Sequence, residues 1–288
     1  MIVTVPASSA NLGPGFDALG LALSLALDAG TVDAARPVDG MPEGARLVDE
    51  HHPSMVAFRL ADGEGELWVR SPIPMGRGLG FSGAARVAGL VAAHAQKAQR
   101  AGEPFSIAAT AAEILVQATL LEGHADNVAA SLLGGLVATA GGRAVRIPLA
   151  LDPAVVAWVP AFTTSTDASR GELTGAVDRA DAVFNVGRVA LLVAALAAGD
   201  VDALRTATQD RLHQDIRLAH AGPSHRAMTA ALDAGAWCAW LSGSGPTIAM
   251  LCPVDQAPAI AAALPVDGHT KLLRVDHAGA RVTGAETR

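Results

Sequence analysis

Three glycine-rich stretches, each placed between predicted regular elements, constrain this chain more than any other feature of its sequence. They read PASSANLGPGFDALGLAL (6–23), PIPMGRGLGFSGAA (72–85) and LSGSGPT (241–247). A single stretch of this kind is more often an ordinary turn than a binding loop, because tight turns need glycine. Three of them in one chain favour a fold in which glycine-rich loops serve a ligand.

The spacing of apolar residues predicts the elements around these stretches. Strands are expected at 1–6, 19–27, 65–74 and 154–160, with hairpins at 136–149 around Gly141-Gly142 and at 236–253. Helices are expected at 82–99, 106–121 with Ser106 as N-cap, 124–133, 178–198, 200–209 and 224–234. We expect a loop from residue 7 to 18, and an irregular segment with short strands from 31 to 66.

The mixture of antiparallel hairpins and separate helices indicates an α+β fold rather than a parallel βαβ sheet. A hairpin closes one group of elements near residue 150, which predicts two domains, 1–150 and 151–288. No period of 20–50 residues recurs, so the chain is not a repeat array.

Composition and charge exclude several classes of function. Of 288 residues, 51% are hydrophobic and 17% charged, which predicts a packed core, and the net charge of −7 argues against a nucleic-acid partner. The N-terminus lacks the basic and apolar regions of a signal peptide, and the apolar run from residue 189 is too short to span a bilayer. We expect a soluble, cytoplasmic protein with no membrane partner. Cys238 and Cys252, outside any zinc-type spacing, are expected to be buried thiols.

The stretch GRGLGFSG (76–83) has the strongest physical case for binding a ligand. It follows a predicted strand and opens a long predicted helix, so backbone N–H groups of the loop and first helical turn point to one place. The helix dipole adds positive potential there, and phosphate is the ligand that such a cradle favours. The stretch lacks the GK[ST] ending of a Walker loop, and no clear parallel βαβ unit of a Rossmann fold surrounds it.

In this order and spacing, the three glycine-rich stretches resemble the three motifs of the GHMP small-molecule kinases. Within that superfamily the chain is most similar to the homoserine kinases. Further stretches that carry the resemblance are EGHADNVAASLLGG (122–135), DAVFNVGRVALLVAAL (181–196) and DRLHQDIR (210–217). The resemblance covers nearly the whole chain.

This resemblance implies a two-domain α+β fold, with a ribosomal S5 domain 2-like N-terminal half and a ferredoxin-like C-terminal half. The implied reaction is transfer of the γ-phosphate of ATP to the side-chain hydroxyl of L-homoserine, on the threonine pathway, with Mg²⁺. Because many relatives are dimers, a homodimer is also expected.

The resemblance assigns the phosphate loop to Gly76, Arg77, Gly78, Leu79, Gly80, Phe81, Ser82 and Gly83. Mg²⁺ needs hard oxygen ligands, and the Ser82 hydroxyl and Glu122 carboxylate are the natural pair. Without the resemblance, the position of Glu122 in the sequence is equally consistent with an exposed charge at the end of a helix.

The remaining motif residues match the parts of homoserine. Asp126 is the best candidate to orient or deprotonate the attacking hydroxyl, with Asn127 and His124 on the same wall. Asn11 and Asp17 supply an amide and an anion for the hydroxyl and the ammonium group.

Arg170 and Arg217 match the positions at which the family binds the substrate carboxylate, which a guanidinium grips with two hydrogen bonds. Arg211, in the same stretch as Arg217, remains an alternative. The pair favours a substrate that carries a carboxylate.

The chain departs from the family pattern in two places. The usual GLGSSAA becomes GLGFSGA, so Phe81 replaces a hydroxyl and Gly83 replaces an alanine, while the backbone cradle and Ser82 remain. The segment 28–72 is short, which leaves recognition of the nucleotide base open. Two alternatives therefore stay open: a GHMP kinase for another small alcohol, and a non-catalytic nucleotide-binding descendant.

Overall fold

The computed structural model describes residues 1–32, 41–163, 171, 173 and 175–283. Within these residues the strands are β1 (Ile2–Asn11), β2 (Gly15–Val32), β3 (Arg46–Leu47), β4 (Glu66–Arg70), β5 (Leu136–Ala140), β6 (Arg143–Ile147), β7 (Ala154–Pro160), β8 (Cys238–Leu241), β9 (Ile248–Cys252), β10 (Gly268–Arg274) and β11 (Arg281–Thr283). The helices are α1 (Pro53–Leu60), α2 (Phe81–Ala101), α3 (Ile107–Glu122), α4 (Asp126–Leu133), α6 (Arg179–Ala198), α7 (Val201–Ala207), α8 (Gln214–Ala219), α9 (Gly222–Asp233) and α10 (Ala257–Ala263).

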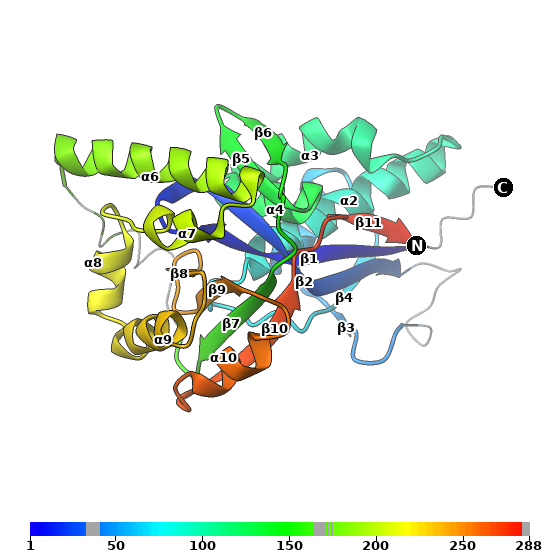
Figure 1. Ribbon diagram of the computed structural model, residues 1–288. Coiled ribbons are helices and arrows are strands. Elements are labelled where there is room, and N and C mark those ends of the chain that lie inside the picture. The colour runs from blue at the N-terminus through cyan, green and yellow to red at the C-terminus, as the bar shows by residue number, and fades with distance from the viewer. Residues whose placement is uncertain (33–40, 164–170, 172, 174, 284–288) are drawn as a thin grey trace.

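The described strands form two antiparallel sheets (Figure 1). The larger sheet has the order β11-β1-β2-β4-β3, and β5 and β6 extend it from β2. Its core is closed by α1, α2, α3 and α4, whose buried side chains are mostly alanine, valine and leucine. Because α2 packs through small residues such as Ala84, Ala88 and Ala92, it lies close against β1.

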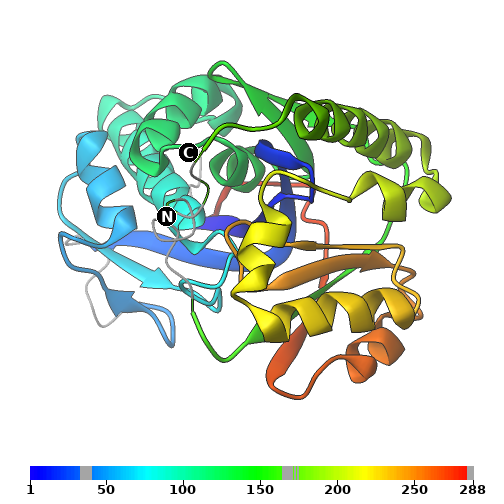
Figure 2. The same ribbon diagram turned by 90° about the vertical axis from the view of Figure 1, so that its left-hand side faces the viewer.

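The smaller sheet has the order β10-β7-β9-β8 and packs against α9 and α10 around Trp158, Ile248 and Met250. Figure 2 shows the helices of the two sheets at opposite sides of the molecule, with α2 and its neighbours above and α9 below. The last described strand, β11, returns to the larger sheet and pairs Val282 with Val3 of β1. The division at residue 150 stays a prediction.

The predicted α+β class and the antiparallel sheets are confirmed. The helices expected in the alanine-rich segment after the phosphate loop and in the long apolar segment after residue 178 are present as α2 and α6. The hairpin turns at Gly141-Gly142, where β5 meets β6. Ser106 stands at the N-cap of α3, but its side chain makes no capping hydrogen bond there.

The expected loop from residue 7 to 18 is wrong. β1 continues to Asn11 and β2 begins at Gly15, so the connection is only Leu12–Pro14. The small side chains of Ala7, Ser8 and Ser9 are fully buried, which lets the strand run beneath the helices although these residues carry little strand propensity. The pairing with β2 shifts register between Ala10 and Asn11, where the turn starts.

The expectation of short strands between residues 31 and 66 is also largely wrong, and residues 33–40 lie outside the described part of the chain. Between β2 and β4, the one strand among the described residues is the two-residue β3, and the main element is helix α1. The Nδ1 atom of His52 accepts a hydrogen bond from the N–H of Ser54, and Pro53 occupies the first turn. Buried Met55 and Phe58 then fix the inner face of the helix.

The two cysteines are free and fully buried, as the sequence predicts. Burial raises the pKa of Cys238 to about 12 and that of Cys252 to about 11, so neither thiol is a nucleophile. Helix α6 has the length and composition of a membrane span, and 22% of its apolar window is buried. Its Asn185 is buried and donates to Pro14 and Asp210, which ties the helix to the folded domain.

Candidate active site

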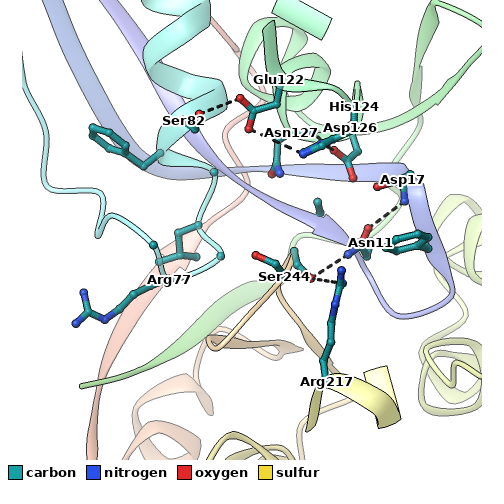
Figure 3. Close-up of a pocket in the computed structure, with 18 of the residues that line it drawn as sticks. Asn11, Asp17, Arg77, Ser82, Glu122, His124, Asp126, Asn127, Arg217 and Ser244 are labelled. Atoms are coloured by element: carbon teal, nitrogen blue, oxygen red, sulfur yellow. Dashed lines mark hydrogen bonds and ion pairs between the residues drawn. The ribbon is translucent and has the colours of Figure 1, made fainter. Parts of the chain in front are cut away.

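A pocket lies where the three glycine-rich stretches meet, between the larger and the smaller sheet (Figure 3). Its lining includes Asn11, Phe16, Asp17, the loop Gly76–Ser82, Glu122, His124, Asp126, Asn127, Arg217, Gly243 and Ser244. The motifs are therefore brought together as the sequence predicts, although up to about 230 residues separate them along the chain.

The second stretch forms the floor of the pocket and needs its glycines. Gly76, Gly78 and Gly80 all have positive φ, which other residues adopt only with strain. A Cβ on Gly78 would lie 2.1 Å from the carbonyl oxygen of Ser242, and one on Gly80 would lie 2.1 Å from the Ser8 hydroxyl. The absence of side chains at Gly78 and Gly80 thus lets the loop backbone contact both other stretches. Gly80 is the N-cap of α2.

A chain of hydrogen bonds joins the three stretches behind the pocket. The indole N–H of Trp240 donates to the Ser9 hydroxyl at 2.9 Å, and the Ser9 and Ser242 hydroxyls lie 2.7 Å apart. The Ser242 hydroxyl donates to the Gly78 carbonyl at 2.6 Å, and the Ser8 N–H donates to the Leu79 carbonyl at 3.3 Å. These contacts hold the loop in one conformation before any ligand arrives.

The side chains of Arg77 and Phe81 are engaged away from the centre of the pocket. The Arg77 guanidinium donates to the carbonyls of Pro160 and Ala161, at 2.9 and 2.7 Å, and Figure 3 shows it directed away from Asn11 and Asp17. The Phe81 ring contacts the His52 ring edge-on, with centroids 5.8 Å apart, and packs on the core. Arg77 and Phe81 therefore contribute mainly their backbone groups to a ligand bound in the loop.

Asp126 is the most buried acid of the pocket, 1% exposed, at the start of α4. Its Oδ1 lies 2.7 Å from Nδ1 of His124 and accepts the N–H of Asn127 at 2.7 Å. An ionised carboxylate can only accept, so Nδ1 of His124 is the donor. Asp17 joins them, since one ligand atom each from Asp17, His124 and Asp126 lies within 4.8 Å of the others. Two carboxylates and an imidazole around one point attract a cation.

The two asparagines line the pocket while holding its parts together. The Asn11 amide donates to the Gly243 carbonyl at 2.9 Å, and its oxygen accepts the N–H of Asp17 at 3.1 Å. The Asn127 amide oxygen accepts the Ser8 hydroxyl at 2.9 Å. These bonds orient Asp17 and connect α4 to β1.

Arg217 is the basic residue on the opposite wall. It is 5% exposed, and Figure 3 shows its guanidinium reaching toward Asn11. Nη1 donates to the Gly243 carbonyl at 3.3 Å, and the guanidinium lies 5.3 Å from the Phe16 ring centroid. Arg211, the alternative in the same stretch, is exposed and pairs with Asp181, so the geometry favours Arg217. Arg170 lies outside the described residues.

His213 lies behind Arg217, and its surroundings predict that the stability of the fold depends on pH. Its Nε2 lies 2.8 Å from the Gly13 carbonyl and its Nδ1 3.2 Å from Arg217 Nη1, so the ring is neutral with the hydrogen on Nε2. Burial lowers the pKa of His213, an effect that the Arg217 charge assists and the Asp210 and Asp17 charges oppose.

Because the pKa of His213 in the folded protein lies below its value of about 6.5 in the unfolded chain, protonation favours the unfolded chain. The contribution of His213 to the free energy of unfolding is therefore complete above about pH 6.5 and decreases as the pH falls below that value. We expect wild type to lose more unfolding free energy between pH 8 and 5.5 than His213→Gln, whose amide can still donate to Gly13. Urea unfolding at the two pH values measures this. Equal losses in both proteins would contradict the role of His213.

Ser82 and Glu122 lie side by side, as the sequence predicts for a metal pair. The Ser82 hydroxyl donates to Glu122 Oε2 at 2.9 Å, and the Glu122 side chain is 9% exposed. A hydroxyl and a carboxylate oxygen at the start of the phosphate-loop helix fit the hard oxygen ligands of Mg²⁺. Glu122 is therefore not the exposed helix-end charge that its sequence position also allowed.

Three residues of this neighbourhood, Phe16, Arg86 and His213, were not predicted from the sequence. Arg86 forms an ion pair with Glu122, and its position four residues after Ser82 on one helix was the available signal. The Phe16 and His213 rings stack with centroids 5.1 Å apart, a contact between distant segments that no local pattern announces.

Comparisons with known proteins agree with this geometry. Residues 45–135 match the family model of the GHMP kinases N terminal domain, and residues 192–268 match that of the GHMP kinases C terminal domain. The chain is 41% identical to a homoserine kinase of Moorella thermoacetica, over 91% of this chain and 92% of that protein. It is 40% identical to a homoserine kinase of Streptomyces coelicolor, over 97% of this chain and 93% of that protein.

Solved structures show the same fold. A crystal structure of homoserine kinase from Cytophaga hutchinsonii is similar with a TM-score of 0.80 and 24% identity, covering 98% of this chain and 96% of that one. A structure of a protein described as a homoserine kinase from Listeria monocytogenes has a TM-score of 0.73 and 28% identity, covering 97% and 98%.

Proposed function

This chain belongs to the GHMP kinases and, within them, to the homoserine kinases, and we propose that its three-loop pocket phosphorylates the side-chain hydroxyl of L-homoserine. ATP is the donor and O-phospho-L-homoserine the product, a step of threonine biosynthesis. The observation that carries the proposal is the pocket itself, which has a phosphate cradle as its floor, carboxylates on one wall and a buried arginine on the other.

The phosphate loop takes the donor. Residues 76 to 82 of this loop line the pocket and α2 begins at Phe81, so we assign the ATP phosphates to backbone N–H groups of the loop and of the first turn of α2. The bonds from Ser8 and Ser242 to the loop organise it in advance, and the Ser9 hydroxyl holds the Ser242 hydroxyl in place. This avoids an entropy loss when ATP binds.

The acceptor is held by its two charged ends. We assign the ammonium group to the Asp17 carboxylate, beside His124 and Asp126, and the substrate carboxylate to the Arg217 guanidinium. Arg170, outside the described residues, is proposed as the second carboxylate ligand. Holding both ends fixes the hydroxyl between the carboxylate wall and the phosphate loop.

Asp126 then directs the hydroxyl. Its Oδ1 accepts the bonds from His124 and Asn127, and we assign Oδ2 to the homoserine hydroxyl. From there the carboxylate orients the oxygen toward the γ-phosphate. It accepts the hydroxyl proton as the new P–O bond forms and the bond from the γ-phosphorus to the bridging oxygen breaks, which releases ADP. Phosphoryl transfer depends mainly on positioning and charge neutralisation, so alignment is the larger contribution.

Ser82 and Glu122 are proposed to hold Mg²⁺. When bound, the ion would neutralise negative charge on the ATP phosphates. Ser82 belongs to both the phosphate loop and the metal pair, so it places the two subsites next to each other.

We further propose that the enzyme acts in the cytoplasm as a homodimer. Support comes from apolar side chains that this chain leaves exposed, at 59% and 76% for Val116 and Leu120 on α3 and at 65% and 70% for Val183 and Val186 on α6. Light scattering on an eluting peak should give twice the chain mass of 29.1 kDa.

An acceptor panel tests the function. Purified protein with ATP and Mg²⁺ is offered L-homoserine, L-threonine, L-serine or mevalonate, and ADP release is followed through pyruvate kinase and lactate dehydrogenase. Rapid turnover with homoserine is expected. Preference for another alcohol would support a different GHMP kinase activity, and nucleotide binding without turnover on any acceptor would support a non-catalytic protein.

A further inference from the structure

A guanidinium already occupies the carboxylate of the proposed metal pair. Arg86 lies one turn after Ser82 on α2, and side chains on a helix lean toward its N-terminus. Its Nη1 therefore reaches Glu122 Oε2, the same oxygen that accepts the Ser82 hydroxyl. Two groups from α2 thus converge on one carboxylate oxygen at the end of α3.

This ion pair is largely shielded from water. The side chains of Arg86 and Glu122 are 22% and 9% exposed, whereas the ion pair between Arg100, on the same helix, and Glu64 is 46% and 73% exposed. The other oxygen of Glu122, Oε1, lies 4.0 Å from Nε2 of His124. An unpaired carboxylate at this depth would be costly, so Arg86 compensates the charge of Glu122 without a metal ion.

We propose that Arg86 is a built-in counter-ion that competes with the divalent metal for Glu122 and thereby weakens the metal subsite. A guanidinium and a divalent cation repel each other and cannot share Oε2, so metal binding requires Arg86 to leave that oxygen. The inference rests on the proposed role of Ser82 and Glu122 as metal ligands. It makes Arg86 a determinant of metal affinity rather than a catalytic residue.

Direct metal binding tests this without any turnover. The full chain, freed of metal with EDTA, is titrated with MnCl₂ in the absence of nucleotide, and free Mn²⁺ is read from its electron paramagnetic resonance signal. Arg86→Gln should bind Mn²⁺ about tenfold more tightly than wild type, because the metal no longer displaces a charge-assisted hydrogen bond. Arg86→Met, which keeps the apolar part of the side chain, should show the same gain in Mn²⁺ affinity. It replaces Arg86→Gln in the experiment if the glutamine variant folds poorly.

Two controls locate the effect. Arg100→Gln removes an exposed ion pair from the same helix and should leave Mn²⁺ affinity unchanged. Adding Glu122→Gln to Arg86→Gln should abolish the gain, because the carboxylate for which metal and arginine compete is then absent. This also separates the site from the Asp17, His124 and Asp126 cluster, which stays intact in all these variants.

Unchanged or weaker Mn²⁺ binding in both Arg86 variants would overturn the inference. If Glu122→Gln alone leaves Mn²⁺ binding as in wild type, the metal subsite is elsewhere and the inference falls with it. Neither outcome touches the kinase assignment, because homoserine-dependent ADP release is measured separately.

Discussion

Replacing Asp126 with asparagine should lower kcat for homoserine by about 10²- to 10⁴-fold, the contribution of a positioned general base. The amide keeps the size of the side chain, and its oxygen can still accept from His124 and from the N–H of Asn127. It cannot take the hydroxyl proton, and its NH₂ group would donate toward the hydroxyl instead of accepting from it. The KM for ATP should change little, since the phosphate loop does not depend on this carboxylate.

The coupled assay with saturating ATP and homoserine measures this effect. Asp178→Asn is a suitable control, because Asp178 is an exposed N-cap of α6 outside the pocket and should keep normal kcat. Near-normal turnover in Asp126→Asn would mean that this residue neither orients nor deprotonates the hydroxyl, and its assignment would fail.

Replacing Arg217 with glutamine should lower kcat/KM for homoserine by about two to three orders of magnitude. Arg217 is 5% exposed, so its charge acts in poorly hydrated surroundings and is strong there. In the Arg217→Gln variant, the substrate carboxylate loses the guanidinium that is proposed to bind it. Most of the loss should appear in the KM for homoserine, because the carboxylate is bound equally in ground state and transition state.

Arg211→Gln is the matched control, six residues away in the same stretch. Arg211 is exposed and pairs with Asp181, so its loss should leave both KM values close to wild type. Circular dichroism and the Tm of Arg217→Gln show whether the buried network with His213 and Gly243 still folds. Equal KM values for homoserine in Arg217→Gln and wild type would remove Arg217 from the substrate site.

Long periodic elements were predictable because their signal is local. The alanine-rich helix α2 and the hairpin at Gly141-Gly142 follow from spacing and turn residues alone. The connection between β1 and β2 was not predictable in this way, because the small polar residues Ser8 and Ser9 are strand residues only through tertiary burial. Helix α1 was missed because its capping residue, His52, is not one of the usual N-cap types.

The candidate site was predictable as a set of motifs but not as a geometry. The sequence indicated that Ser82 pairs with Glu122 and that Asp126 lies near His124, and both pairs are in contact. The orientation of the Phe81 ring was not predictable from the sequence, since it depends on a contact with His52 from a distant segment. Nor could the sequence separate Arg217 from Arg211, whose difference is burial alone.

Transfer of the phosphoryl group to homoserine can be followed directly by ³¹P nuclear magnetic resonance of the enzyme with ATP, Mg²⁺ and L-homoserine. We expect a new phosphomonoester signal that grows in step with ADP and is nearly absent with Asp126→Asn. Formation of inorganic phosphate without the phosphomonoester, or no consumption of ATP, would contradict phosphoryl transfer to homoserine in this pocket.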